Sequence, residues 1–254
     1  MKNKAIGKIN YILGIMLTLV IITAVILAAV TANKDAKSPL GANGEYAQGI
    51  DVSSHNGEID WKTVSQNTEF AIIRAGYRGY GDEGTITEDK NFRDNIKGAN
   101  EAELPAGVYF YTQAVNEKEA EEEAEFVIKL LHKNNISLPV FIDFEYPYDS
   151  AGNPCGRMYN AKLSREQATK IINAFCKKIK HAGYDAGVYS SSSVYNFHLS
   201  VSDFDEDICI WVADYNKAVT FTGDYDIWQY SKTGSCAGVN SKYCDVNRWY
   251  SSVS

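Results

Sequence analysis

The sequence contains no group of cysteine and histidine residues with the spacing that metal sites require. None of its five cysteines belongs to a Cys-x-x-Cys motif, which structural zinc sites commonly use. The glycine-rich segment 76–84, GYRGYGDEG, does not form a G-x-G-x-x-G turn that leads directly from a strand into a helix. That context is what a dinucleotide site needs. The sequence therefore predicts neither a metal centre nor a cofactor.

Positive charge is scarce in most of the chain. The whole sequence of 254 residues has a formal net charge of −7. Residues 1–33 carry three lysines and no acidic residue, so the remainder has a net charge of −10. A domain this acidic does not attract nucleic acid or anionic lipid headgroups. We therefore expect no nucleic-acid partner.

Charge is absent altogether from residues 11–30, YILGIMLTLVIITAVILAAV. A run of this length can span a bilayer as a helix, and it is longer than the usual apolar core of a cleaved signal peptide. The preceding lysines, within residues 1–10, place that end in the cytoplasm by the positive-inside rule. We therefore expect residues 11–30 to be a transmembrane signal-anchor, followed by a polar tether over residues 31–46.

A signal peptide cleaved after Ala32 is the alternative to this anchor. In both cases residues 47–254 are exported as one domain, either held at the cell membrane by a single span or secreted. The five cysteines fit an oxidising compartment outside the cell. Cys236 and Cys244 bracket a short hairpin-like segment, AGVNSKY, and we predict a disulfide between them. The pairing of the other three is left open.

Strand-like and helix-like segments alternate from residue 48 onwards. Strands are predicted at residues 48–54, 69–77, 106–113, 138–146, 185–192, 207–215, 225–231 and 244–250. Helices are predicted at residues 58–64, 88–103, 116–133 and 164–184. Repeated strand–helix units imply parallel strands with right-handed crossovers. Eight strands with a β-rich second half predict an α/β fold made of a single irregular (β/α)-type barrel, and an open doubly wound sheet is the alternative.

Two acids lie at the end of the predicted strand LPVFIDFEY. Side chains alternate between the two faces of a strand, so Phe141, Asp143 and Glu145 share the face that points into the barrel. The same alternation turns Asp51 inward from the first strand. Acids gathered at a barrel mouth raise one another's pKa, which makes a general acid available near neutral pH. The alternative is that these acids cap helices or pair with a basic residue such as Arg74.

The ordered segments resemble family 25 glycoside hydrolases, the cell-wall muramidases. The segments that carry the resemblance are GIDVSSHNGEIDW, FAIIRAGYRGY, AGVYFYTQAVNEKEAEEEAEFVI, LPVFIDFEY, IWVADY, IWQYS and CDVNRW, between Gln48 and Tyr250. The resemblance implies a (β/α)5β3 barrel, an enzyme that cuts the β-1,4 bond between N-acetylmuramic acid and N-acetylglucosamine, and peptidoglycan glycan strands as the partner. We expect this enzyme to be a monomer.

The resemblance also assigns roles to the acids. Glu145 matches the general acid/base of the family, and Asp143 matches the acid two residues before it. Asp51 and Asp245 match two further acids of the site. Asp214 falls at a variable position of the family pattern, and we leave it out of the predicted site.

Candidate substrate-binding residues are aromatic or basic. Tyr111, Tyr189 and Trp228 match cleft positions of the family, where aromatic faces stack on sugar rings. Arg74 points the same way as Ile72 and could pair with Asp51 or Asp143, although a purely structural ion pair explains it nearly as well.

The Asp-x-Glu spacing bears on the mechanism. Residues i and i+2 of a strand hold their Cβ atoms roughly 6–7 Å apart, wider than the roughly 5–5.5 Å of a direct carboxylate nucleophile. The resemblance favours a retaining reaction in which the 2-acetamido group of the substrate attacks, with Asp143 as its partner. An inverting pair remains the alternative by spacing alone.

Two other functions compete with this hypothesis. One is a catalytically idle module that binds peptidoglycan, against which the four intact acids argue. The other is a chitinase-like hydrolase, whose D-x-x-D-x-D-x-E pattern is absent because Leu138, Val140 and Phe141 precede Asp143.

Overall fold

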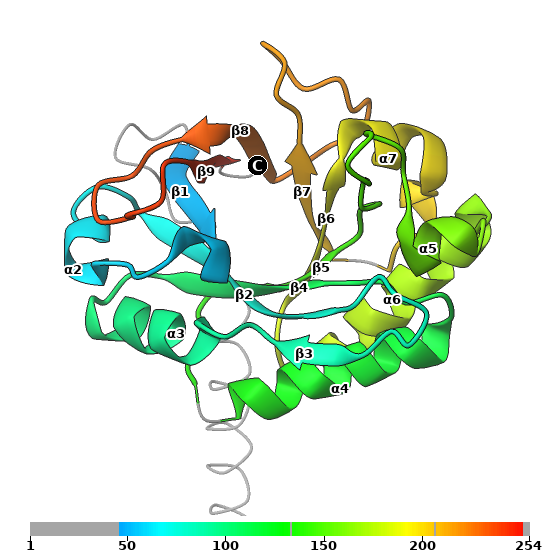
Figure 1. Cartoon of the computed structure of the whole chain (residues 1–254), viewed down its shortest axis with the longest axis horizontal. Coiled ribbons are helices and arrows are strands. Elements are labelled where there is room, and N and C mark those ends of the chain that lie inside the picture. The colour runs from blue at the N-terminus through cyan, green and yellow to red at the C-terminus, as the bar shows by residue number, and fades with distance from the viewer. Residues whose placement is uncertain (1–45, 133, 206, 251–254) are drawn as a thin grey trace, which may run out of the picture. The chain divides into compact units, whose positions relative to one another are not determined.

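The computed structural model describes residues 46–132, 134–205 and 207–250 (Figure 1). The predicted anchor at residues 11–30 lies outside the described residues and stays a prediction. Among the helices that are described, none is both long and apolar enough to cross a membrane.

Eight strands form a closed barrel. β1 (Tyr46–Val52) pairs with β2 (Phe70–Arg78) on one side and with β9 (Cys244–Tyr250) on the other, which closes the sheet. The strands between them are β4 (Ala106–Tyr111), β5 (Val140–Asp143), β6 (Ala186–Ser191), β7 (Cys209–Ala213) and β8 (Ile227–Gly234). The predicted barrel is confirmed, and the open doubly wound sheet is excluded.

The repeated strand–helix units had implied parallel strands, but not all of the strands are parallel. Neighbours from β1 through β8 run parallel, whereas β9 is antiparallel to both β8 and β1. Only residues 235–243 connect β8 to β9, and a parallel connection needs about a dozen residues or more. A further strand, β3 (Ile86–Glu88), was not among the predicted strands, and it pairs antiparallel with β2 outside the barrel.

Helices follow each of the first five barrel strands. They are α2 (Trp61–Val64), α3 (Phe92–Glu101), α4 (Glu117–Leu131), α5 (Gly156–Asn160), α6 (Arg165–His181) and α7 (Ser192–His198), with 3-10 turns η1 (Ser54–Asn56) and η2 (Val201–Asp203). Figure 1 shows α3, α4 and α6 outside the barrel wall. Side chains fix where the long helices begin. Asn116 accepts the backbone N–H of Glu119, and Ser164 forms a capping box with Gln167.

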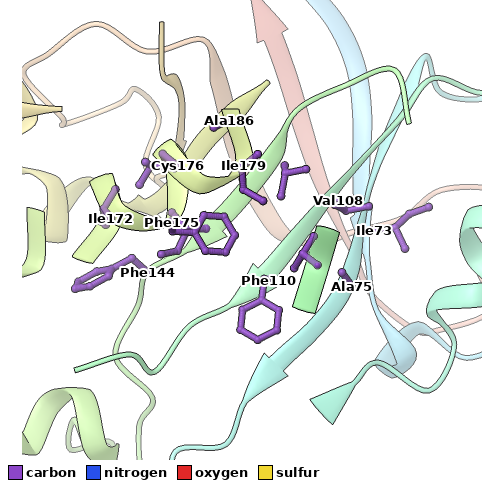
Figure 2. Close-up of a cluster of buried hydrophobic side chains, with 14 of the residues drawn as sticks. Ile73, Ala75, Val108, Phe110, Phe144, Ile172, Phe175, Cys176, Ile179 and Ala186 are labelled. Carbon is purple, nitrogen blue, oxygen red and sulfur yellow. The ribbon is translucent and has the colours of Figure 1, made fainter. Parts of the chain in front are cut away.

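Alternation along the strands divides the core into two clusters. The outer cluster packs strands against helices, and Figure 2 shows Val108 and Phe110 of β4 with Phe175 and Ile179 of α6. The inner cluster fills the barrel with Phe70, Ile72, Leu138, Phe141, Trp211 and Trp249. Glycine is needed where these inner rings meet the wall, because a Cβ atom at Gly49 would lie 2.2 Å from the ring of Phe70. The interior of the barrel is therefore a packed apolar core, and the polar residues described below lie above it.

Candidate active site

The structure brings the four predicted acids into one cleft of about 760 Å³. Asp51 of β1 lies directly opposite Asp245 of β9. Asp143 is the last residue of β5, and Glu145 follows just beyond the strand. These positions lie at or near the carboxyl ends of the parallel strands β1 and β5, where enzymes of this architecture carry their sites.

Among the four predicted acids, Asp51 is the one that accepts two side-chain amides. Its Oδ2 accepts the side-chain amide of Gln229 at 2.8 Å and that of Asn247 at 2.8 Å. Burial raises the pKa of Asp51 to about 6, while the two amide donors act in the opposite direction because they favour the charged form. Burial thus raises the pKa of Asp51 less than it would without these two donors.

Glu145 and Asp245 hold their protons to higher pH. Burial, followed by the negative charge of Asp51, raises the pKa of Glu145 to about 7. Burial and the charges of Asp51 and Glu145 raise the pKa of Asp245 to about 8. The ammonium group of Lys232, which also lines the cleft, lowers both values. A carboxyl group that is partly protonated at neutral pH can act as a general acid.

Asp143 is buried and incompletely satisfied. Its Oδ1 atom has no hydrogen-bond partner within the described part of the chain. Burial, and then the charges of Glu145 and Asp51, raise the pKa of Asp143 well above its ordinary value, against a lowering effect from Arg74. A buried acceptor without a donor is costly, so this atom is a candidate for a hydrogen bond from a ligand.

The sequence had allowed an ion pair between Arg74 and Asp51 or Asp143, but the structure does not contain it. Its guanidinium group lies 2.7 Å from the carboxylate of Asp89 and donates to the hydroxyl of Ser54. The same Asp89 carboxylate accepts the backbone N–H of Ser54. Arg74 therefore holds the turn after β1 in place, which is the structural alternative, and it reaches Asp143 only through its charge.

The predicted aromatic residues separate into three situations. Tyr189 lines the cleft, together with Tyr109 and Trp211. Tyr111 sits beside Asp143 in the parallel ladder but is not part of the cleft lining. Trp228 is on the outer side of β8, where its indole donates to the carbonyl of Asp214 at 2.7 Å. Alternation explains this position, because the next residue of β8, Gln229, points inward to Asp51.

Asp214, which the sequence analysis left out, also lines the cleft. Its carboxylate accepts five hydrogen bonds, from the hydroxyl of Ser192 and from backbone and side-chain donors of Asn216 and Thr220. These donors hold the pKa of Asp214 well below its usual range. A carboxylate this saturated shapes the loop after β7 and has no free lone pair for acid–base work.

Other residues of the site were also missed. Gln229, Lys232, Tyr215 and Ser192 line the cleft, whereas Asn247 contacts Asp51 without lining it. Alternation in IWQYS and CDVNRW places Gln229 and Asn247 on the inner face with Asp245. That signal could have identified both amides. For Lys232 and Tyr215, which lie near or beyond strand ends, no local pattern indicates the cleft.

The segment that follows Glu145 is held by a polar network. Gln113 donates its amide to the carbonyl of Glu145 and accepts the backbone N–H of Met158, each at 3.4 Å. Arg157 donates to the carbonyl of Gln113 and forms a two-contact ion pair with Glu119 at 2.6 and 3.0 Å. The first turn of α4 thus secures the loop that carries Glu145.

The predicted disulfide is wrong in this structure. Both Cys236 and Cys244 are free thiols. Cys244 is opposite Gly234 in the antiparallel ladder, and Cys236 lies two residues further along. Separately, no group of three or more His, Cys, Asp or Glu side chains in the described ranges is suited to hold a metal ion.

Comparison with known proteins gives consistent matches. The profile of the family described as Glycosyl hydrolases family 25 matches residues 50–239. The chain is 30% identical to Lysozyme M1 of Streptomyces globisporus over 227 aligned residues. The alignment covers 85% of this chain and 71% of that protein.

Solved structures agree with this match. The modular autolysin LytC from Streptococcus pneumoniae, in complex with a synthetic peptidoglycan ligand, has a TM-score of 0.67 and 32% identity, covering 81% of this chain. The chain spans only 47% of that autolysin. The bacterial lysozyme from Streptomyces coelicolor shares the fold, with a TM-score of 0.60, 24% identity, and coverage of 80% of this chain and 91% of that one. Since the family profile matches residues 50–239 and a relative 30% identical covers 85% of this chain, the chain belongs to glycoside hydrolase family 25.

Proposed function

We propose that this protein is an exported muramidase that cleaves the β-1,4 bond between N-acetylmuramic acid and N-acetylglucosamine in peptidoglycan. The observation that carries the proposal is the group of four acids in one cleft, with the pKa of each raised by burial. The similarity to a protein named lysozyme, and to an autolysin solved with a peptidoglycan ligand, supports this substrate.

Glu145 is the proton donor in this proposal. Its pKa of about 7 leaves a large fraction protonated at neutral pH, as a general acid requires. The proton passes to the glycosidic oxygen as the bond to the anomeric carbon breaks. Glu145 is then a carboxylate and can take a proton from the water that completes hydrolysis.

Asp143 is the partner of the substrate's acetamido group. The unpartnered Oδ1 of Asp143 supports this role, because an acetamido N–H would supply the missing donor. The acetamido oxygen attacks the anomeric carbon and forms an oxazoline-like intermediate, which water opens from the other face. Two inversions retain the anomeric configuration.

The proposed location follows from the N-terminal segment. The uncharged run at residues 11–30, preceded by lysines, supports a single-span anchor with the barrel outside the cell, or secretion if that segment is cleaved. The glycan strands of the wall are then the partner, and the enzyme works as a monomer.

The test is to incubate the full chain with purified peptidoglycan and identify the new reducing end by mass spectrometry. N-acetylmuramic acid at that end is the expected result. N-acetylglucosamine at that end would show a different bond specificity. Binding of peptidoglycan without any new reducing end would instead indicate the idle module.

A further inference from the structure

Asp51 receives two amide donors on a single oxygen atom. The amides of Gln229 and Asn247 come from different strands, and both contact Oδ2 of Asp51 at 2.8 Å. Asp51 also lines the cleft. Two N–H donors on one oxygen fix the plane of this carboxyl group and favour its charged form.

Aromatic donors fix the orientation of each amide. The Oε1 atom of Gln229 accepts the hydroxyl groups of Tyr189 at 2.9 Å and Tyr215 at 2.7 Å. The Oδ1 atom of Asn247 accepts the indole N–H of Trp211 at 2.9 Å. An amide whose oxygen is occupied in this way can only present its NH₂ group to Asp51.

This network is buried and joins distant parts of the chain. Gln229 is 2% exposed and Asn247 is fully buried. They lie 178 and 196 residues from Asp51 in the sequence. The barrel could close with apolar residues at both positions, which would cost less than burying two amides. The polar choice therefore calls for a role beyond packing.

We propose that Gln229 and Asn247 are positioning residues that keep Asp51 as a fixed anion, so that its charge holds the proton on Glu145. The proposal deepens the muramidase function and rests on it. Electrostatics supports it, because the charge of Asp51 contributes to the raised pKa of Glu145, Asp143 and Asp245.

Several other charged or titratable groups surround Asp51. The acids are Asp143, Glu145 and Asp245, and the cations whose charges reach this group of acids are Arg74 and Lys232. The charge of Asp51 also raises the pKa of three tyrosines and one cysteine, in each case after the larger effect of burial. These residues are Tyr109, Tyr189, Tyr215 and Cys244. The acids are therefore the groups that exchange protons with Asp51 near neutral pH.

The sign of the expected effect follows from this coupling. Removing an amide donor raises the pKa of Asp51, because the charged form loses a hydrogen bond. Asp51 then keeps its proton to higher pH and repels the charge on Glu145 less. Glu145 consequently loses its proton at lower pH, and the alkaline limb of the activity profile moves down, by no more than the shift that the charge of Asp51 causes in Glu145.

The test compares Asn247→Ala, Gln229→Ala and Tyr215→Phe with the parent chain. Tyr215→Phe keeps a half-exposed ring and removes one of the two donors to Gln229, so it should fold and show a smaller shift in the same direction. The matched control is Asn240→Ala, which removes an exposed amide bonded to the carbonyl of Glu58. We expect kcat to fall about tenfold in the buried variants with little change in KM.

Two readouts separate this proposal from a structural role and from the muramidase assignment. The first is the pH profile of kcat/KM, and folded variants that lose activity without moving the alkaline limb would overturn the proposal. The second is the pKa of the Asp51 carboxyl group, measured by ¹³C NMR, which needs no activity and should rise in both alanine variants. If Asn247→Ala does not fold, Tyr215→Phe decides. A parent chain that cuts no peptidoglycan would refute the function, whereas an unchanged Asp51 pKa in the variants would refute the positioning role.

Discussion

Asp51 of β1 and Asp245 of β9 lie directly opposite each other across an antiparallel pair and line the same cleft. Opposed residues in such a pair have Cα atoms about 4.5–5.5 Å apart. Two carboxyl groups on such neighbouring residues do not ionise equally well, because each charge disfavours the other. Asp51 has two amide donors and the pKa of about 6, whereas burial and the charge of Asp51 raise the pKa of Asp245 to about 8. At neutral pH Asp51 is therefore mostly an anion, whereas Asp245 mostly keeps its proton.

Replacing Glu145 with Gln should abolish lysis while leaving the fold intact. The variant loses the proton donor to the leaving oxygen, which costs about 10²–10⁴-fold in rate. Release of muropeptides from purified peptidoglycan measures the effect, and Glu83→Gln, which removes an exposed acid, is the control. Activity of Glu145→Gln within a factor of two of the parent would remove Glu145 from its proposed role.

Replacing Asp143 with Asn should lower kcat severely with little change in glycan binding. The acetamido N–H needs an acceptor that carries negative charge as the oxazoline forms. The side-chain amide of Asn is neutral and cannot supply that charge. Steady-state kinetics measures the split, with Asp224→Asn, an exposed acid near β8, as the control. Glycan without the acetyl group on muramic acid should be nearly inert. An inverted first product in NMR, or a trapped Asp143–sugar ester, contradicts this mechanism.

Replacing Lys232 with Met should shift the pH profile in the direction opposite to the amide variants. The ammonium group of Lys232 lowers the pKa of Glu145 and Asp245. Without it, both acids keep their protons to higher pH, and the alkaline limb of kcat/KM moves up. The matched control is Lys62→Met on α2, a lysine outside the cleft lining. An unmoved or lowered limb in Lys232→Met would show that this charge does not act on Glu145.

Replacing Arg78 with Met should destabilise the barrel by about 3–5 kcal/mol. Arg78 donates to Glu123 at 2.6 Å, and both side chains are buried, so the variant leaves Glu123 without its guanidinium partner. Urea unfolding gives the free energy. Arg93→Met is the control, because it breaks an exposed pair with Glu88 and should change stability little. If the two substitutions lowered the free energy of unfolding equally, burial of the ion pair would not determine how much stability is lost.

Local patterns identified much of the molecule. Alternation in LPVFIDFEY placed Phe141 in the inner cluster and Val140 and Ile142 in the outer one, as the structure shows. The caps at Asn116 and Ser164 were also predicted correctly. Each signal needs only residues a few positions apart, because strand alternation and helix capping are properties of the local backbone.

The open alternatives and the errors both concerned long-range partners. For Arg74 the sequence left a pair with Asp51 or Asp143 and a purely structural ion pair both open, and the structure shows the structural pair, with Asp89. Trp228 was expected in the cleft but lies on the outer face of β8. The Cys236–Cys244 bond was expected from proximity in sequence, whereas both cysteines are free thiols in the structure. In each case the choice among several possible partners depends on register or on a strand elsewhere in the barrel.

The sequence by itself determined the eight barrel strands, the long helices, the inward face of β1 and β5, and, through its ordered segments, the family. Only the tertiary structure decided that β9 runs antiparallel to β1, so that Asp245 faces Asp51, and that Gln229 and Asn247 converge on one carboxylate oxygen. The physical reason is separation along the chain. Periodicity specifies which face a side chain takes, but only closure of the barrel brings together residues that are nearly 200 positions apart.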